Sequence, residues 1–88
     1  MKADLKKALK AKAHALKPVI LLGAKGLTSA VIEETDIALQ AHELIKIKLT
    51  GVERDERKNI AEAFCTQLKA ELIQLIGTIA VIYRKNIT

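Results

Sequence analysis

The sequence predicts a single small domain of the α/β (α+β) class, in which three helices pack against a mixed four-stranded sheet. Stretches with helical periodicity alternate along the chain with short apolar runs of strand length. Hydrophobic residues make up 50% of the 88 residues, far above the range of disordered chains. The expected order is helix, strand, helix, strand, helix, strand, strand, within one domain that covers residues 1–88.

A first helix is expected over residues 2–16, because this stretch is rich in Ala, Leu and Lys, which favour helices. Pro18 should end it, since proline lacks an amide donor and biases Lys17 away from helical angles. At about 100° per residue, one stripe of the helix carries Leu5, Leu9 and Leu16. The strip beside it carries Lys2, Lys6, Lys10 and Lys17.

A strand–helix–strand unit is expected next. The apolar run 19–22 lies between a proline and a glycine, which indicates a buried strand. Thr28 can cap a second helix that continues to about residue 41. Residues 44–49 alternate apolar side chains with Lys46 and Lys48, which is typical of a half-buried strand.

The remaining chain predicts a third helix over about residues 54–70 and two strands, Leu72–Ile76 and Ile79–Tyr83. Gly77-Thr78 joins these strands as a hairpin turn, so they should be antiparallel. The two strand–helix–strand steps call for parallel strands joined by right-handed crossovers. Three of the strands are apolar on both sides, so helices should cover parts of both faces. The strand order stays open.

The loop Gly23-Ala24-Lys25-Gly26 is the most informative chemical feature. It joins a strand end to a helix start, where unpaired amides and a partial positive charge favour an anion. Glycines let a ligand approach the backbone closely, and a G-x-x-G loop clamps the RNA backbone in KH domains. Two glycines at such a junction are also ordinary turn chemistry.

Charge supports a polyanionic partner. The chain has a formal net charge of +5, and Asp4 is the single acid among the first 32 residues. The one-sided lysine strip therefore favours RNA over a merely solvated helix face, and we expect its ammonium groups to flank the glycine loop. Arg57 and Lys58 are further RNA-binding candidates, although acids at Glu53, Asp55 and Glu56 partly neutralise them. Lys46 and Lys48 extend the basic surface only if no helix covers their side of the strand.

The sequence does not predict an enzyme. Neither His14 nor His42 belongs to a catalytic or metal-ligand constellation, and the lone Cys65 reads as a packing residue. We expect no catalytic residue, metal, cofactor or small-molecule substrate. No apolar run approaches the roughly 20 residues that span a bilayer, and no apolar signal core is present. A cytoplasmic monomer without membrane contact is the expectation.

Four motifs in order carry a family resemblance. The segment LKPVILLGAKGLT at residues 16–28 is followed by HELIKIK at 42–48, IQLIG at 73–77 and VIYR at 81–84. Together they closely resemble the YhbY-type CRM domain, the chloroplast RNA splicing and ribosome maturation family, from about Leu5 to Arg84. Two positions depart from its pattern. Thr78 stands where a basic residue usually follows the hairpin glycine, and Lys69-Ala70-Glu71 lacks a glycine before the strand.

The resemblance implies a fold similar to the C-terminal domain of translation initiation factor three. It also implies RNA binding through the G-x-x-G loop and adjacent basic surface. Stand-alone prokaryotic members resemble ribosome-assembly factors associated with precursors of the large subunit, whereas plant relatives carry the domain in organellar intron-splicing proteins. The function expected for this chain is accordingly binding of ribosomal RNA from such precursors.

Two other function classes stay open. A protein-interaction module without direct RNA contact would use an exposed apolar face or edge of the sheet, and its binding would be insensitive to salt. A nucleotide-handling enzyme would use the glycine loop on a small phosphate ligand. The sequence disfavours the enzyme, because it has no G-x-x-x-x-G-K-[ST] motif and no partnered acid or base.

Overall fold

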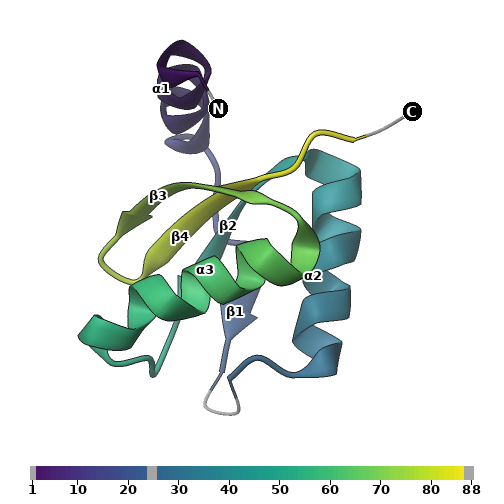
Figure 1. The fold of residues 1–88 in the computed structure, drawn as a ribbon, viewed down its shortest axis with the longest axis vertical. Helices are drawn as coiled ribbons and strands as arrows, with labels where there is room; N and C mark the ends of the chain where they lie inside the picture. The colour runs from purple at the N-terminus through teal and green to yellow at the C-terminus, as the bar shows by residue number, and fades with distance from the viewer. Residues whose placement is uncertain (1, 24–25, 87–88) are drawn as a thin grey trace.

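The structure is a computed structural model that describes residues 2–23 and 26–86 (Figure 1). These residues form three α-helices, one short 3₁₀ helix and four strands, which confirms the predicted class and order. The elements are α1 (Ala3–Ala13), β1 (Ile20–Leu22), α2 (Ser29–His42), β2 (Leu44–Leu49), η1 (Arg54–Glu56), α3 (Arg57–Leu68), β3 (Glu71–Ile76) and β4 (Ile79–Tyr83).

The strands form one mixed sheet in the order β1-β2-β4-β3. β1 pairs with β2 in parallel, and β4 lies antiparallel between β2 and β3. β2 and β3 therefore run in the same direction although they do not touch. Both strand–helix–strand steps connect parallel strands, as the sequence predicts, and the final hairpin is antiparallel.

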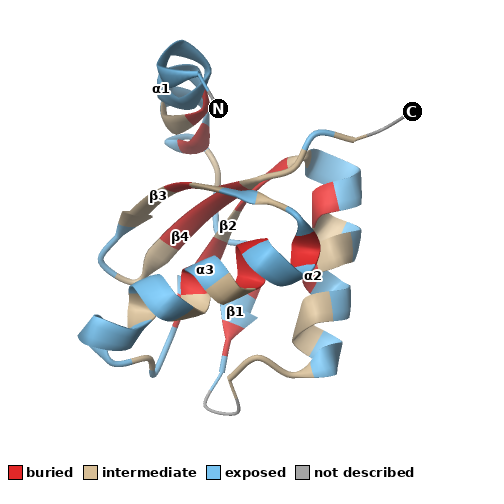
Figure 2. Cartoon of the chain, in the orientation of Figure 1, coloured by how far each residue is buried: buried red, intermediate tan, exposed pale blue. Residues whose placement is uncertain are grey.

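One face of the sheet, here called the sealed face, is covered by α2 and α3 (Figure 2). Phe64 and Leu39, both fully buried, project from these helices onto the strands. Aliphatic residues supply nearly all of the remaining core, as the shortage of aromatic residues requires. The cluster contains Ile20, Leu22, Leu39, Ile45, Ile47, Leu49, Ala61, Phe64, Cys65, Leu68, Ala80 and Ile82.

The opposite face, here called the open face, is only partly covered. α1 lies across one end of it and buries Leu9 and Ala13 against Leu44, Ile73 and Val81. The rest of this face is exposed to different degrees. It carries Leu21, Lys46, Lys48, Gln74, Ile76 and Ile79. Helices thus cover parts of both faces, as predicted, but α1 covers much less than α2 and α3 together.

A β-bulge interrupts β3. The register with β4 shifts between Leu72 and Gln74, so Ile73 is the extra residue. Ile73 packs in the α1 cluster, while Gln74 pairs with Val81 on the same face. The side chains of two successive residues of β3 therefore lie on the open face, which strict alternation along a strand would not allow.

Some element boundaries differ from the sequence prediction. α1 ends at Ala13 rather than Leu16, so Lys17 lies in a linker and not on the helix. The linker is held to β2 instead, since Lys46 Nζ donates to the Leu16 carbonyl at 3.0 Å and the Val19 amide donates to the Lys46 carbonyl. Helix three begins with the 3₁₀ turn η1 and ends at Leu68.

Two side chains hold α2 in place. Thr28 is confirmed as its N-cap, because its hydroxyl oxygen accepts a hydrogen bond from the Val31 amide at 3.2 Å. At the middle of the helix, Arg84 donates to Asp36 Oδ1 at 2.7 Å, and it also donates to the Leu68 carbonyl of α3 at 3.1 Å. The end of β4 is thereby tied to both helices of the sealed face.

Candidate nucleic-acid interface

Three turns and two helix N-termini meet at one edge of the sheet, here called the strand-end edge (Figure 1). β1, β2 and β3 run in the same direction, so their C-terminal ends share this edge. Gly23 and Gly26 follow β1 there, residues 50–51 follow β2, and residues 77–78 follow β3. Leu22 pairs with Leu49, whose amide donates to the Thr78 carbonyl at 2.7 Å. Ligands of open α/β sheets characteristically bind at such an edge.

The glycine corner 23–26 is accessible in the part that the structure describes. Gly23 is exposed, and Gly26 is in the left-handed region with a φ of 71°. A Cβ added at either glycine would meet nothing within 4 Å among the described atoms. The Gly26 amide donates to the Gly23 carbonyl at 3.0 Å, which closes the turn in front of α2. Two predicted site residues, Ala24 and Lys25, lie outside the described residues.

Basic side chains surround this edge. Lys48 is exposed on β2. It lies near the glycine corner, because it pairs with Leu21 close to the end of β1. Arg57 and Lys58 open α3, whose N-terminus carries the partial positive charge of the helix dipole. The structure therefore brings Arg57 and Lys58 to the same edge as Gly23 and Gly26.

Arg57 also has a structural role. Its Nε donates to the Val52 carbonyl at 3.2 Å, and one terminal nitrogen donates to the Gly77 carbonyl at 3.4 Å. It thereby joins two of the three turns. A guanidinium has five N–H donors, so three remain for a phosphate. Lys58 is fully available, since it is exposed at the helix surface.

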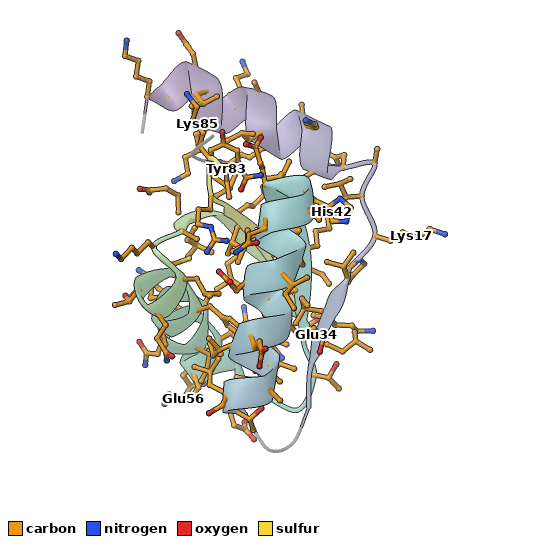
Figure 3. The ribbon with its side chains drawn as sticks, turned by 90° about the vertical axis from the view of Figure 1, so that its right-hand side faces the viewer. Lys17, Glu34, His42, Glu56, Tyr83 and Lys85 are labelled. Atoms are coloured by element: carbon orange, nitrogen blue, oxygen red, sulfur yellow. The ribbon has the colours of Figure 1, made fainter. Side chains whose placement is uncertain are left out.

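The predicted lysines of the N-terminal segment lie elsewhere. Figure 1 shows α1 and the glycine corner at opposite ends of the long axis, and the molecule extends 33 Å along it. Lys2 and Lys6 are exposed on α1, Lys10 is half-buried there, and Lys17 points outward from the linker (Figure 3). The expectation that these lysines flank the corner is wrong. After a turn at His14 and Ala15, residues 17–22 carry the chain across the sheet, and about six extended residues span up to roughly 20 Å.

The two basic regions also differ in how many acidic side chains they contain. α1 carries Asp4 alone, whereas Glu53, Asp55 and Glu56 are all exposed beside the start of α3. The strand-end edge thus has a mixed surface in which backbone amides and two helix dipoles supply part of the positive potential. α1 presents a nearly uniform field of ammonium groups.

The described residues offer little for acid–base or metal chemistry. They contain no group of three or more His, Cys, Asp or Glu side chains that could hold a metal ion. Burial raises the pKa of the Cys65 thiol to about 11, so this group stays protonated at neutral pH. None of the described helices is long and apolar enough to cross a membrane.

Sequence reasoning missed several residues that the fold brings together. Gly51 has a φ of 78° in the turn next to the glycine corner. His14 and Gln74 meet at a groove between α1 and the open face. The bulge that turns Gln74 to the open face could not be predicted, because nothing in the strand sequence ELIQLI marks an extra residue.

Fold and site together define a small α+β domain whose strand-end edge carries basic side chains and two helix N-termini. The model of the CRS1 / YhbY (CRM) domain matches residues 1–84, and the chain belongs to this family.

Relatives agree with this assignment. The chain is 46% identical to the Probable RNA-binding protein PA4753 of Pseudomonas aeruginosa, over 94% of this chain and 80% of that one. It is also 46% identical to an RNA-binding protein of Haemophilus influenzae, over 92% of this chain and 82% of that one. The solution structure of the hypothetical protein SAV1595 from Staphylococcus aureus superposes with a TM-score of 0.87 at 31% identity, covering 100% of this chain and 92% of that one.

Proposed function

We propose that this protein binds RNA, and that its RNA is ribosomal, from precursors of the large subunit during ribosome assembly. It acts as a cytoplasmic monomer and holds RNA without catalysing a reaction. The family membership and the names of the relatives support RNA as the partner. The ribosomal assignment rests on the resemblance of the chain to stand-alone CRM proteins.

One observation carries the proposal most directly, which is the convergence of basic side chains and two helix N-termini at the strand-end edge. Phosphates favour helix N-termini because unpaired amides and the helix dipole point toward them. The glycine corner supplies close backbone approach, and Lys48, Arg57 and Lys58 supply full charges. In this proposal Gly23, Ala24, Lys25 and Gly26 hold one stretch of RNA backbone.

The lysines of α1 and its linker then form a second contact. α1, which carries Lys6 and Lys10 and follows Lys2, lies at the far end of the long axis, and Lys17 lies in the linker between α1 and the glycine corner. One RNA segment that touches both regions must therefore run along the sheet. Contacts from such lysines fix the position of the backbone and carry no sequence information. Sequence or structural preference must come from other groups.

Charge reversal at the strand-end edge tests the proposal. The double variant Lys48→Glu, Lys58→Glu should bind a single-stranded oligoribonucleotide at least tenfold more weakly, measured by fluorescence anisotropy. The slope of log affinity against log salt should become shallower by about 1.4, since each phosphate contact of single strands contributes about −0.7.

A matched control is the double variant Lys69→Glu, Lys85→Glu, which makes the same change of charge at exposed lysines away from that edge. It should lose much less affinity. Equal losses in the two variants would assign binding to net charge alone and reject the strand-end edge. Crosslinking in cells, followed by sequencing of the attached RNA, tests the ribosomal assignment; recovery of messenger RNA alone would overturn it.

An interaction with another protein is a second candidate, because the open face exposes apolar side chains. Leu21 is 66% exposed and Ile76 is 58% exposed. Exposed apolar surface that is rimmed by polar groups is typical of protein contacts. Such binding would be insensitive to salt, so the salt slope of the previous experiment separates the two functions.

A further inference from the structure

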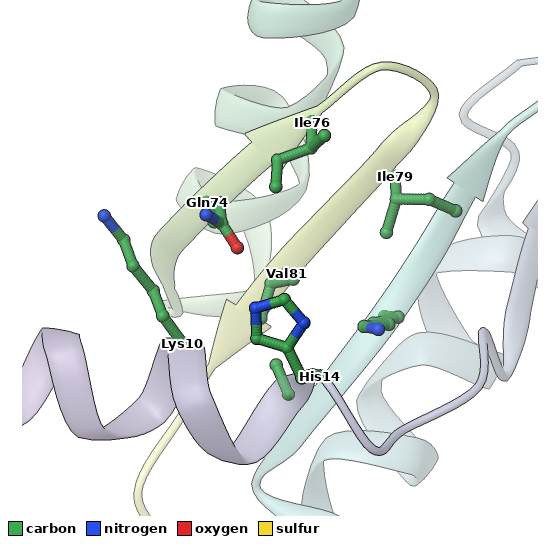
Figure 4. Close-up of a pocket in the computed structure, with 8 residues that line it drawn as sticks. Lys10, His14, Gln74, Ile76, Ile79 and Val81 are labelled. Atoms are coloured by element: carbon green, nitrogen blue, oxygen red, sulfur yellow. The ribbon is translucent and has the colours of Figure 1, made fainter.

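We propose that the groove between α1 and the open face receives one unpaired base of the bound RNA. This inference rests on the proposed RNA-binding function and adds the place where a base, rather than a phosphate, is recognised. The groove lies apart from the glycine corner, between the last turn of α1 and strands β2, β4 and β3 (Figure 4).

The size and floor of the groove fit a planar ring. Its volume is about 170 Å³, and Ile76, Ile79 and Val81 supply apolar surface along β3 and β4. Sites that enclose a drug-sized ligand measure roughly 300–1,000 Å³, so this groove suits a single ring system. Ile76 is 58% exposed, so a base that covered it would remove apolar surface from water.

Two polar side chains stand where they can recognise a base. The His14 imidazole projects from the end of α1 over the strands, and Gln74 reaches the same space from β3 (Figure 4). Unpaired RNA bases commonly stack on aromatic rings, including histidine, and hydrogen-bond along their edges. A carboxamide both donates and accepts, which suits the mixed edge of a base. The bulge at Ile73 is what turns Gln74 to this face.

The charges around the groove match a nucleotide. Lys10 from α1 and Lys46 from β2 lie at its rim, and no carboxylate lines it among the described residues. Lys46 is held in place because its Nζ donates to the Leu16 carbonyl at 3.0 Å. It keeps further N–H donors for a phosphate on either side of the base. An apolar floor, with two ammonium groups and no carboxylate around it among the described residues, complements a base with its flanking phosphates.

The occupant should be unpaired. In a duplex both faces of a base are stacked and its pairing edge is occupied, so a paired base cannot enter a narrow groove without being extruded. The groove would therefore favour single-stranded segments, bulges and loops over helical RNA. The strand-end edge, which contacts backbone, would not make this distinction by itself.

A pair of isoleucine variants tests the groove. Ile76→Glu places a carboxylate inside it, whereas Ile37→Glu makes the same change on α2, where Ile37 is 61% exposed. Ile76→Glu should weaken binding of a single-stranded oligoribonucleotide at least tenfold, and Ile37→Glu less than threefold. His14→Ala should cost several-fold, compared with His42→Ala at the exposed end of α2. Circular dichroism and thermal melts establish that each variant is folded.

An abasic oligoribonucleotide of the same length isolates the base from the backbone. The unchanged protein should bind the abasic strand and a blunt duplex more weakly than the normal strand, and Ile76→Glu should abolish that preference.

If the protein binds RNA with a steep salt dependence but the two isoleucine variants behave alike, the groove is not a base site and the proposed function survives. If the unchanged protein binds no RNA, both proposals fail. Specific capture of a protein by the groove in place of RNA would also overturn this one.

Discussion

The sealed face and the open face of the sheet are built from the same four strands, yet their surroundings differ. On the sealed face, α2 and α3 close a cluster of twelve buried residues around Phe64. On the open face, α1 closes a cluster of only five and leaves Ile76 and Leu21 exposed. Since apolar burial is the main favourable term in folding, most of the stability should come from the sealed face. The open face is left free to bind.

The largest effect should separate the cores of the two faces. Phe64→Ala should lower the free energy of unfolding by about 3–5 kcal/mol, because it removes a fully buried ring and leaves a cavity. Leu9→Ala, at the edge of the α1 cluster, should cost about 2 kcal/mol, the lower end for such truncations. Urea denaturation measures both values. Equal losses would break the comparison, because the open face would then contribute as much as the sealed one.

Hydrogen exchange sharpens the same contrast. α1 has 11 residues, and isolated helices shorter than about 12–15 residues are marginal in water. Its stability therefore depends on Leu9 and Ala13. Amides of α1 should exchange through a local opening, and Leu9→Ala should speed that exchange without changing the amides of α3. A uniform change across both helices would show that α1 unfolds only with the whole domain.

A smaller effect is expected at the clamp that ties the sheet to the helices of the sealed face. Arg84→Ala should cost about 2 kcal/mol, because hydrogen bonds from the guanidinium to carbonyls of two helices are lost. Its ion pair with Asp36 should contribute little, since that carboxylate is partly exposed. Lys85→Ala is the control at the next, exposed residue and should stay within about 0.5 kcal/mol. A similar cost for both would show that the clamp is not structural.

The smallest effect on stability is expected from Cys65, a thiol buried in the core of the sealed face. Desolvation by burial, and secondarily the charges of Glu71 and Glu62, raise the pKa of Cys65 to about 11 from 9.0. The native thiol at pH 8 should react with an aromatic disulfide far more slowly than the thiol of the urea-unfolded chain. Because the folded pKa is the higher one, the stabilisation from this group is complete below pH 9 and is lost toward pH 11. Cys65→Ala should show a flatter loss of stability over that interval, measured as the urea midpoint.

Local sequence signals predicted most of the fold. Thr28 marked the start of α2, and the alternation of residues 44–49 gave β2 its observed bounds. The end of α1 was wrong by three residues, because Pro18 constrains only its immediate neighbour. Beyond Ala13 the chain leaves the helix, and a contact far along the sequence holds it there, since Lys46 donates to the Leu16 carbonyl. Strand order and the bulge in β3 depend on such distant contacts too, so the sequence left the first open and gave no sign of the second.

The candidate site was only half predictable. The corner at Gly23 and Gly26 has a local signature, but its neighbours come from other strands and from α3. Proximity in sequence suggested that the lysines before Pro18 lie beside the corner. The linker and β1 instead place α1 and its lysines at the other end of the molecule, with Lys17 between α1 and the corner. The base groove had no local signature at all, because it is formed by one turn of α1 and three strands.

The two outer strands of the half-uncovered sheet offer little backbone for a second copy to pair with. β1 has only three residues, so a second copy would find few backbone groups to pair with on that side. On the other side, the irregularity at Ile73 twists β3 and spoils the straight ladder that a neighbouring chain would need. Both margins therefore discourage fibril growth, and the apolar side chains between them stay free in a crowded solution.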